Sequence, residues 1–154
     1  MGIVQEFSDA TIAETTNAFR KRVEASTVLM LSELGESLVK YARERHNYKD
    51  RTGNLTNSIG YVVVNKRKVV SNGGFGNGSG ANNGYSIALK LASDTPQDYS
   101  LIVVAGMNYA AYVEAKGYNV ILPAELKAMN DFPETIKRLT KMAKSEASRI
   151  YGVY

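Results

Sequence analysis

The chain has 154 residues, enough for one domain with a hydrophobic core, and its 44% content of hydrophobic residues excludes a generic disordered tail. It contains no cysteine, which excludes disulfides, thiolate metal sites and thiol nucleophiles, and it has no apolar run long enough for a transmembrane helix. The net charge of +4 is too small for a dedicated nucleic-acid binder, although it allows weak attraction to DNA or to an acidic protein surface.

The first third of the chain predicts one long amphipathic helix over residues 9 to about 47. Ser8 can cap its first turn, and Phe7 and Ile12 have the spacing of a hydrophobic staple. Gly35 interrupts the apolar stripe and indicates a bend or a close contact. At about 1.5 Å per residue this helix would be roughly 55–60 Å long, more than a domain of this size can cover. We therefore expect part of it to pack on a neighbouring subunit.

A turn and a strand follow this helix. Residues 50–54 form a turn rich in residues that bond their own backbone or tolerate a positive φ. Residues 58–64 are β-branched and aromatic and predict a strand. Residues 66–68 are a basic turn or strand edge, and Val69 and Val70 follow.

The segment 72–84 is dominated by glycine and asparagine, with six glycines and four asparagines. Such a composition loses much entropy on ordering and buries little. It predicts a loop that is mobile in an isolated chain and is held by a neighbouring chain in an assembly.

The second half predicts further short elements. We expect strands at 85–92, 99–105 and 118–122, with a turn at 94–98. We expect a short helix from Asn108 to Lys116 with Gly117 at its C′ position, a helical turn or two at 123–130, and a final helix opened by the box Asp131–Glu134. Because the strands are joined by short loops, the sheet should be mainly antiparallel. The predicted fold class is α+β, with a long N-terminal and a C-terminal helix packed on a small sheet in a single domain, 1–154.

No arrangement of residue types predicts catalysis. His46 is the only histidine and lies near a helix end, which favours a surface role. Glu114 has no partner carboxylate at a fixed spacing, and an ion pair or a cap on a neighbouring element explains it better. The glycine-rich segment lacks the lysine and the helix of a phosphate loop. We therefore expect no enzyme activity, no cofactor and no metal site, although a small hydrolase using His46 or Glu114 stays an alternative.

Basic residues and tyrosines are the other distinctive types. Basic clusters occur at 20–22, 40–51 and 66–68, and Lys137, Lys141 and Lys144 share one face of the last helix. Such clusters can attract duplex DNA without reading its sequence, or can simply form a solvated face. Ten tyrosines and no tryptophan suit protein interfaces, and the core is an equally good explanation for them.

Two segments resemble signature stretches of the neck, or tail-completion, proteins of tailed double-stranded DNA bacteriophages. Residues 50–59, Asp-Arg-Thr-Gly-Asn-Leu-Thr-Asn-Ser-Ile, resemble a D-x-T-G-x-L-x-x-S-I pattern. Residues 109–114, Tyr-Ala-Ala-Tyr-Val-Glu, followed by Gly117, resemble a later Y-A-x-x-V-E-x-G pattern. The insertion at 72–84 and the residues Ala115 and Lys116 before Gly117 depart from that pattern.

This resemblance implies a structural virion protein, a head–tail connector or tail-completion subunit. Such a protein assembles as a ring of six or twelve copies around the DNA passage, and its partners are itself and the adjoining portal, head-closure and tail proteins. It would lie in the virion neck, after assembly in the host cytoplasm, with no membrane contact. Residues 1–6 lack the features of a secretory signal, which fits that location. The alternative function is a non-specific DNA-binding accessory protein.

The candidate site residues come from the two segments. In the first, Asp50, Thr52 and Gly53 are expected to fix the turn that aims the first strand, and Leu55 and Ile59 to anchor it. In the second, the expected supports or contacts of an assembly surface are Tyr109, Tyr112, Glu114 and Gly117.

Overall fold

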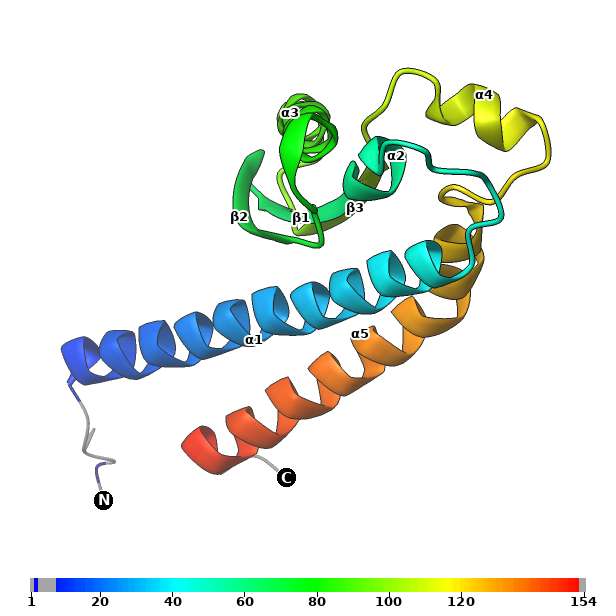
Figure 1. Cartoon of the computed structure of the whole chain (residues 1–154). Coiled ribbons are helices and arrows are strands. Elements are labelled where there is room, and N and C mark those ends of the chain that lie inside the picture. The colour runs from blue at the N-terminus through cyan, green and yellow to red at the C-terminus, as the bar shows by residue number, and fades with distance from the viewer. Residues whose placement is uncertain (1, 3–7, 153–154) are drawn as a thin grey trace.

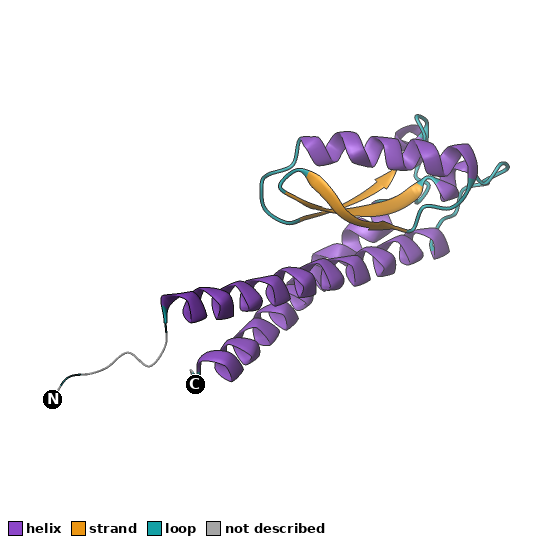
Figure 2. Ribbon diagram, turned by 90° about the vertical axis from the view of Figure 1, so that its left-hand side faces the viewer, coloured by secondary structure: helices purple, strands orange, loops and turns teal. Residues whose placement is uncertain are grey.

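A computed structural model describes residues 2 and 8–152 of the chain. Helix α3 covers one face of a three-stranded sheet, helix α1 covers the other face, and helix α5 runs along α1 (Figures 1 and 2). The elements in chain order are α1 (Asp9–Glu44), α2 (Asn54–Asn57), β1 (Ile59–Asn65), β2 (Lys68–Gly73), α3 (Gly78–Ser93), β3 (Ser100–Ala105), α4 (Ala110–Ala115) and α5 (Leu122–Tyr151). The predicted α+β class and antiparallel sheet are confirmed.

The sheet has the strand order β2-β1-β3, with both pairings antiparallel. The central strand β1 is buried on both faces, because α1 and α3 cover it from opposite sides. Its side chains alternate between two clusters, with Ile59, Tyr61 and Val63 facing α1 and Val62 and Val64 facing α3. The outer edges of β2 and β3 form no strand pairs among the described residues.

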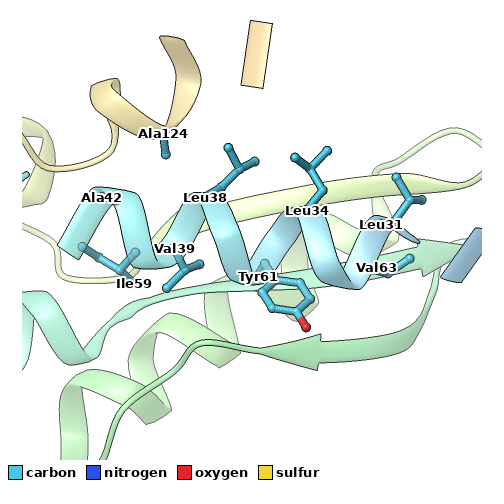
Figure 3. Packing of buried hydrophobic residues seen from close by; sticks show 9 residues of the cluster. All are labelled: Leu31, Leu34, Leu38, Val39, Ala42, Ile59, Tyr61, Val63 and Ala124. Carbon is cyan, nitrogen blue, oxygen red and sulfur yellow. The ribbon is translucent and has the colours of Figure 1, made fainter. Parts of the chain in front are cut away.

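Helix α1 forms as predicted, and Ser8 caps it by accepting a hydrogen bond from Thr11 N at 3.1 Å. The expected staple involves Phe7, which lies outside the described residues. Figure 3 shows Leu34 and Leu38 directed toward the side where Ala124 of α5 lies. Gly35 marks a close contact, since a Cβ there would meet the ring of Tyr61 at 2.5 Å.

The prediction of a loop at 72–84 and a strand at 85–92 is wrong. Residues 68–73 form β2, and residues 78–93 form one helix, α3. The helix packs through small residues spaced four apart, since Gly80, Gly84, Ala88 and Ala92 are all buried. A Cβ on Gly80 or Gly84 would lie well inside van der Waals contact with a backbone carbonyl oxygen, of Asn54 or Ser58 respectively. These glycines therefore allow close packing of α3 on α2 and on the start of β1.

The C-terminal region is also simpler than predicted. Residues 118–121 are a loop instead of a strand, and α5 is continuous from Leu122 to Tyr151. The predicted capping box at Asp131–Glu134 does not begin a helix. It lies in the middle of α5, with Pro133 inside the helix. Proline removes the hydrogen bond to the carbonyl four residues earlier, that of Met129. Met129 and Pro133 are both exposed residues of α5.

Helix α4 is shorter than expected, and Asn108 does not cap it. Its N-cap position is Tyr109, which makes no side-chain capping bond. Gly117 does follow the last turn with a φ of +88°, as the predicted C′ position requires.

The hairpin between β1 and β2 turns through two basic residues in the left-handed region. Asn65 pairs with Lys68, and the intervening Lys66 and Arg67 have φ values of +51° and +62°. A two-residue turn of this kind favours the sequence Asn-Gly. Any other residue in the left-handed region costs about 1–2 kcal/mol of conformational energy. Thr95 O accepts a hydrogen bond from Arg67 Nε at 3.0 Å and compensates part of the cost.

We expect the double substitution Lys66→Asn with Arg67→Gly to raise the free energy of unfolding by about 1 kcal/mol. Asparagine and glycine adopt a positive φ more easily than lysine and arginine, so the backbone strain at both positions falls. Urea denaturation measures the change. The matched control is Lys66→Ala with Arg67→Ala, which removes the same charges without relieving the backbone and should give no gain. Equal stability of the two variants would mean that the turn is unstrained.

Candidate functional site at the junction of the two sequence segments

The two segments singled out in the sequence meet in the folded chain. Tyr48 and Leu55, from the first region, form a buried cluster with Ala110 and Val120, from the second. Met107 and Val113 pack against this cluster. The junction lies where the chain leaves α1 and where it enters α5, so it fixes one end of the helical pair to the sheet.

The first segment is fixed by local hydrogen bonds. Asp50 Oδ2 accepts from Thr56 N at 2.8 Å, and Thr52 Oγ1 accepts from Asn54 N at 3.3 Å. Gly53 takes a φ of +73° at the N-cap position of α2. A side chain is strained in that conformation, which explains a glycine there. These three residues thus set the path of the turn into α2 and β1.

Leu55 and Ile59 anchor this turn in different clusters. Leu55 is 2% exposed in the junction, whereas Ile59 is fully buried under α1. Arg43 of α1 donates from Nη2 to Ile59 O at 3.0 Å. Burial lowers the pKa of the Arg43 guanidinium, and the nearby Tyr48 and Glu36 oppose that effect.

In the second segment, Glu114 caps α5. Its Oε1 accepts from Ile121 N at 3.0 Å and from Leu122 N at 2.6 Å. Ile121, the N-cap residue of α5, makes no side-chain capping bond itself. The carboxylate therefore satisfies free N–H groups and lies at the positive end of the helix dipole. The sequence-based expectation of a cap on a neighbouring element agrees with this geometry.

Tyrosines on and next to α4 are directed outward. Tyr109, Tyr112 and Tyr118 are 38%, 65% and 46% exposed. Lys116 Nζ lies 5.3 Å from the centre of the Tyr112 ring, within reach of a cation–π contact. The helix makes few contacts with other helices and strands, and Figure 1 shows it standing apart from them. It forms a knob of aromatic and basic side chains, which we call the α4 knob (Tyr109, Tyr112, Lys116 and Tyr118).

Sequence reasoning missed several polar residues that join the segments. Ser58 is fully buried, and its Oγ accepts from Gly106 N at 3.0 Å and donates to Leu55 O at 2.7 Å. Asn47 Oδ1 accepts from Asn119 N at 2.7 Å. Ser58 belongs to the first signature segment, but its role depends on a residue 48 positions away. No local pattern could have shown it.

Tyr48 ties the end of α1 to α2. Its hydroxyl lies 3.1 Å from Thr56 Oγ1, and its ring stacks on the exposed His46 with 4.7 Å between ring centres. Burial raises the pKa of the Tyr48 hydroxyl, and the hydrogen bond with Thr56 partly offsets this. The two residues considered for catalysis in the sequence therefore have structural contacts. His46 packs on the Tyr48 ring, and the Glu114 carboxylate accepts hydrogen bonds from the α5 backbone.

A second feature is an apolar groove of about 1000 Å³ between α1, β3 and α5. Leu31, Leu34 and Leu38 of α1 line its floor, with Leu101 and Val103 along the β3 side. On α5, Phe132 and Ile136 line the groove and are 45% and 39% exposed. Water therefore reaches the groove mainly at Phe132 and Ile136, whereas the three leucines of α1 are buried.

The exposed apolar surface continues along α5 beyond the groove. Leu122, Leu126 and Met129 are 43%, 55% and 69% exposed. Only Ala124 and Thr135 of this 30-residue helix are buried. An amphipathic helix normally covers its apolar face. The chain alone thus leaves part of α5 without a covering surface.

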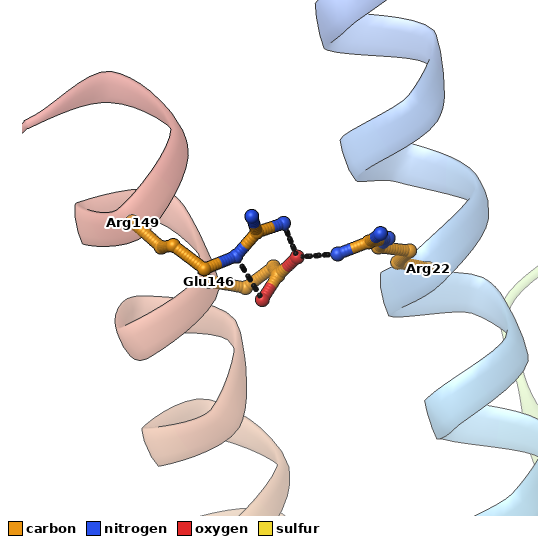
Figure 4. A network of polar contacts seen from close by, with 3 residues as sticks. All are labelled: Arg22, Glu146 and Arg149. Carbon is orange, nitrogen blue, oxygen red and sulfur yellow. Dashed lines mark hydrogen bonds and ion pairs between the residues drawn. The ribbon is translucent and has the colours of Figure 1, made fainter.

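A group of basic residues of the helical pair lies along its free end. Helices α1 and α5 lie side by side there, with Lys21 on α1 and Lys137, Lys141 and Lys144 on α5 exposed. Arg22 of α1 and Arg149 of α5 both bind Glu146 (Figure 4). Phe19 and Tyr151 pack edge to face at 5.9 Å nearby.

The Glu146 contacts predict a pH dependence. Hydrogen bonds from Arg149 and Arg22 lower the pKa of Glu146 from 4.5 to about 2. A lowered pKa stabilises the folded form above the ordinary value, and the contribution is lost as pH falls through the folded pKa. Because intrinsic amide exchange itself slows in this range, the quantity compared is the protection factor, which we expect to fall for amides near residues 143–151 between about pH 4.5 and 2. Hydrogen exchange measures this, and in the Glu146→Gln control that pH-dependent difference should disappear.

The described residues contain no group of three histidine, aspartate or glutamate side chains placed to hold a metal ion. None of the described helices is long and apolar enough to cross a membrane. No family model, no curated protein and no solved structure matches this chain.

Proposed function

We propose that this chain is a structural virion subunit of the phage neck, a head–tail connector or tail-completion protein that assembles as a homo-oligomeric ring around the DNA passage. The observation that carries the proposal is the uncovered apolar groove between α1, β3 and α5, together with the exposed apolar residues of α5. Exposed apolar side chains that gather beside an apolar groove often mark a site of protein–protein contact.

The resemblance of residues 50–59 and 109–117 to the phage neck family supports the same function. The two segments are in contact, and their polar residues act as caps and turn supports. Such roles suit a protein that works by holding a shape and contacting neighbours. The expected partners are further copies of the chain and the adjoining portal, head-closure and tail proteins.

The proposal is tested by the mass of the purified protein in solution across a range of concentrations, with electron micrographs of the same samples. We expect closed rings of six or twelve copies. A protein that remains monomeric up to millimolar concentration would contradict self-assembly.

The second candidate is non-specific DNA binding through the basic end of the helical pair, favoured by the exposed Lys137, Lys141 and Lys144. Binding of duplex DNA should then weaken steeply with salt. The variant with all three lysines changed to glutamate should lose that binding while its assembly is unchanged. Unchanged DNA affinity in this variant would remove the candidate.

A further inference from the structure

We propose that the groove binds the α4 knob of a second copy of this chain, so that neighbouring copies join head to tail. The inference rests on the proposed function, because it names the two surfaces through which the subunit would assemble. It is carried by the shape and charge of these surfaces, which lie on different parts of the same molecule.

The lining of the groove suits a partner surface that is apolar and carries positive charge at its edge. Its charged lining residues are Asp98 and Glu125, both acidic. Neither forms an ion pair within the described part of the chain. Glu24 lies near enough to the lining residue Tyr99 to raise the pKa of its hydroxyl, behind the larger effect of burial. A docked aromatic surface would thus be met by three carboxylates.

The α4 knob has the complementary character. Tyr112 and Tyr118 offer large apolar rings with polar tips, the type of residue that dominates interface energies. Lys116 lies on the same exposed surface, over the Tyr112 ring. Tyrosine loses little conformational entropy on docking for the area it buries, so two such rings suit a groove of this volume.

The surroundings of the knob add further positive charge. Arg45, Lys49 and Arg51 are exposed on the chain that leads from α1 into the junction. The acidic residues of that region have partners. Asp50 accepts from Thr56 N, Glu114 caps α5, and Glu44 Oε1 lies 3.9 Å from Lys40 Nζ. The outward charge at this end is therefore basic, whereas the groove is acidic. Opposite potentials of this kind orient an encounter and fix which surfaces meet.

A contact between two different surfaces repeats from copy to copy. Such a heterologous contact closes into a ring when the rotation between copies allows it. The knob cannot enter its own groove while Glu114 holds it at the start of α5 and Ala110 and Val113 pack against the cluster of Tyr48. The occupant is therefore the knob of another copy.

The first test exchanges the charges. Asp98→Lys with Glu125→Lys reverses the groove, and Lys49→Glu, Arg51→Glu and Lys116→Glu together reverse the knob end. Each variant alone should self-associate at least tenfold more weakly in sedimentation at low salt. Mixing the two variants one to one should restore association, because each then offers what the other binds. Circular dichroism checks that both variants fold.

The second test uses the absence of native cysteine. Tyr112→Cys in one tagged chain and Phe132→Cys in another should form a disulfide-linked heterodimer on oxidation, in higher yield than either variant alone. Ser86→Cys, on the exposed side of α3, replaces Phe132→Cys in the control and should not cross-link.

The outcomes separate the two proposals. If the wild type assembles, but charge reversal has no effect and the cysteines do not cross-link, the groove has another occupant and only the docking inference fails. If the wild type stays monomeric at every concentration, self-assembly and docking fail together. Weakened single variants with restored mixing, and selective cross-linking, support the docking.

Discussion

Replacing Gly84 by alanine is expected to lower the free energy of unfolding by about 2–3 kcal/mol. Replacing glycine by alanine inside a helix normally stabilises a protein by up to about 1 kcal/mol. A loss of stability at Gly84 would therefore already indicate close packing. The loss arises because a Cβ at Gly84 would overlap the Ser58 carbonyl oxygen and lie 2.9 Å from the Phe75 ring. Ser58 is fully buried directly before β1, so its backbone cannot move aside at low cost.

Urea denaturation at a concentration where the protein is monomeric measures the effect, and a thermal midpoint lower by roughly 5–10 °C should accompany it. The matched control is Asn82→Ala, on the exposed side of the same helix, which should gain a few tenths of a kcal/mol. A stabilised Gly84→Ala variant would show that α3 does not pack closely on the chain at Ser58, because an alanine is favourable only in a helix with room for its Cβ.

Helix α3 shows why composition misled the sequence analysis. Glycine and asparagine lower intrinsic helix propensity, and the pattern Tyr85, Ile87, Leu89, Leu91 has the alternation of a strand. The informative signal was the four-residue spacing of Gly80, Gly84, Ala88 and Ala92, which only becomes favourable once a sheet lies beneath it. Leu89 and Leu91 are instead 45% and 44% exposed on the flanks of the helix.

Elements whose stability depends on local pattern were predictable. Strand β1 is buried as its β-branched run indicated, and in the α1 stripe Leu34 and Leu38 are buried, whereas Ile12 is 49% exposed and β3 buries only Val104. Residue Asp50 acts within its own turn, so its role follows from local chemistry. By contrast, the pairing of Ser58 with Gly106 and of Asn47 with Asn119 joins distant positions, and only the folded chain reveals it.

Helix α5 illustrates a second limit. The box from Asp131 to Glu134 and the proline within it have the features of a helix start. The structure begins the helix nine residues earlier, at Leu122, because Glu114 supplies the cap from another segment. A tertiary cap thus replaces the local one, and Pro133 is tolerated on the exposed side.

Glu114→Ala should therefore destabilise the protein by about 2 kcal/mol, since it leaves two N–H groups at the start of α5 without their charged acceptor. Glu114→Gln should cost less, about 1 kcal/mol, because an amide oxygen still accepts but its charge no longer interacts with the helix dipole. Denaturation of monomeric protein measures both variants.

The matched control is Glu125→Ala, in the first turn of the same helix. In the monomer this carboxylate makes no hydrogen bond within the described part of the chain, so only its interaction with the helix dipole is lost. That loss should be no more than about 0.5 kcal/mol. Because Glu125 also lines the groove, it is a control for stability and not for self-association. Because the Glu114 cap also fixes α4 against α5, Glu114→Ala should weaken self-association as well as stability. A variant that unfolds more easily yet assembles as well as the wild type would mean that the position of α4 does not matter for the contact between copies.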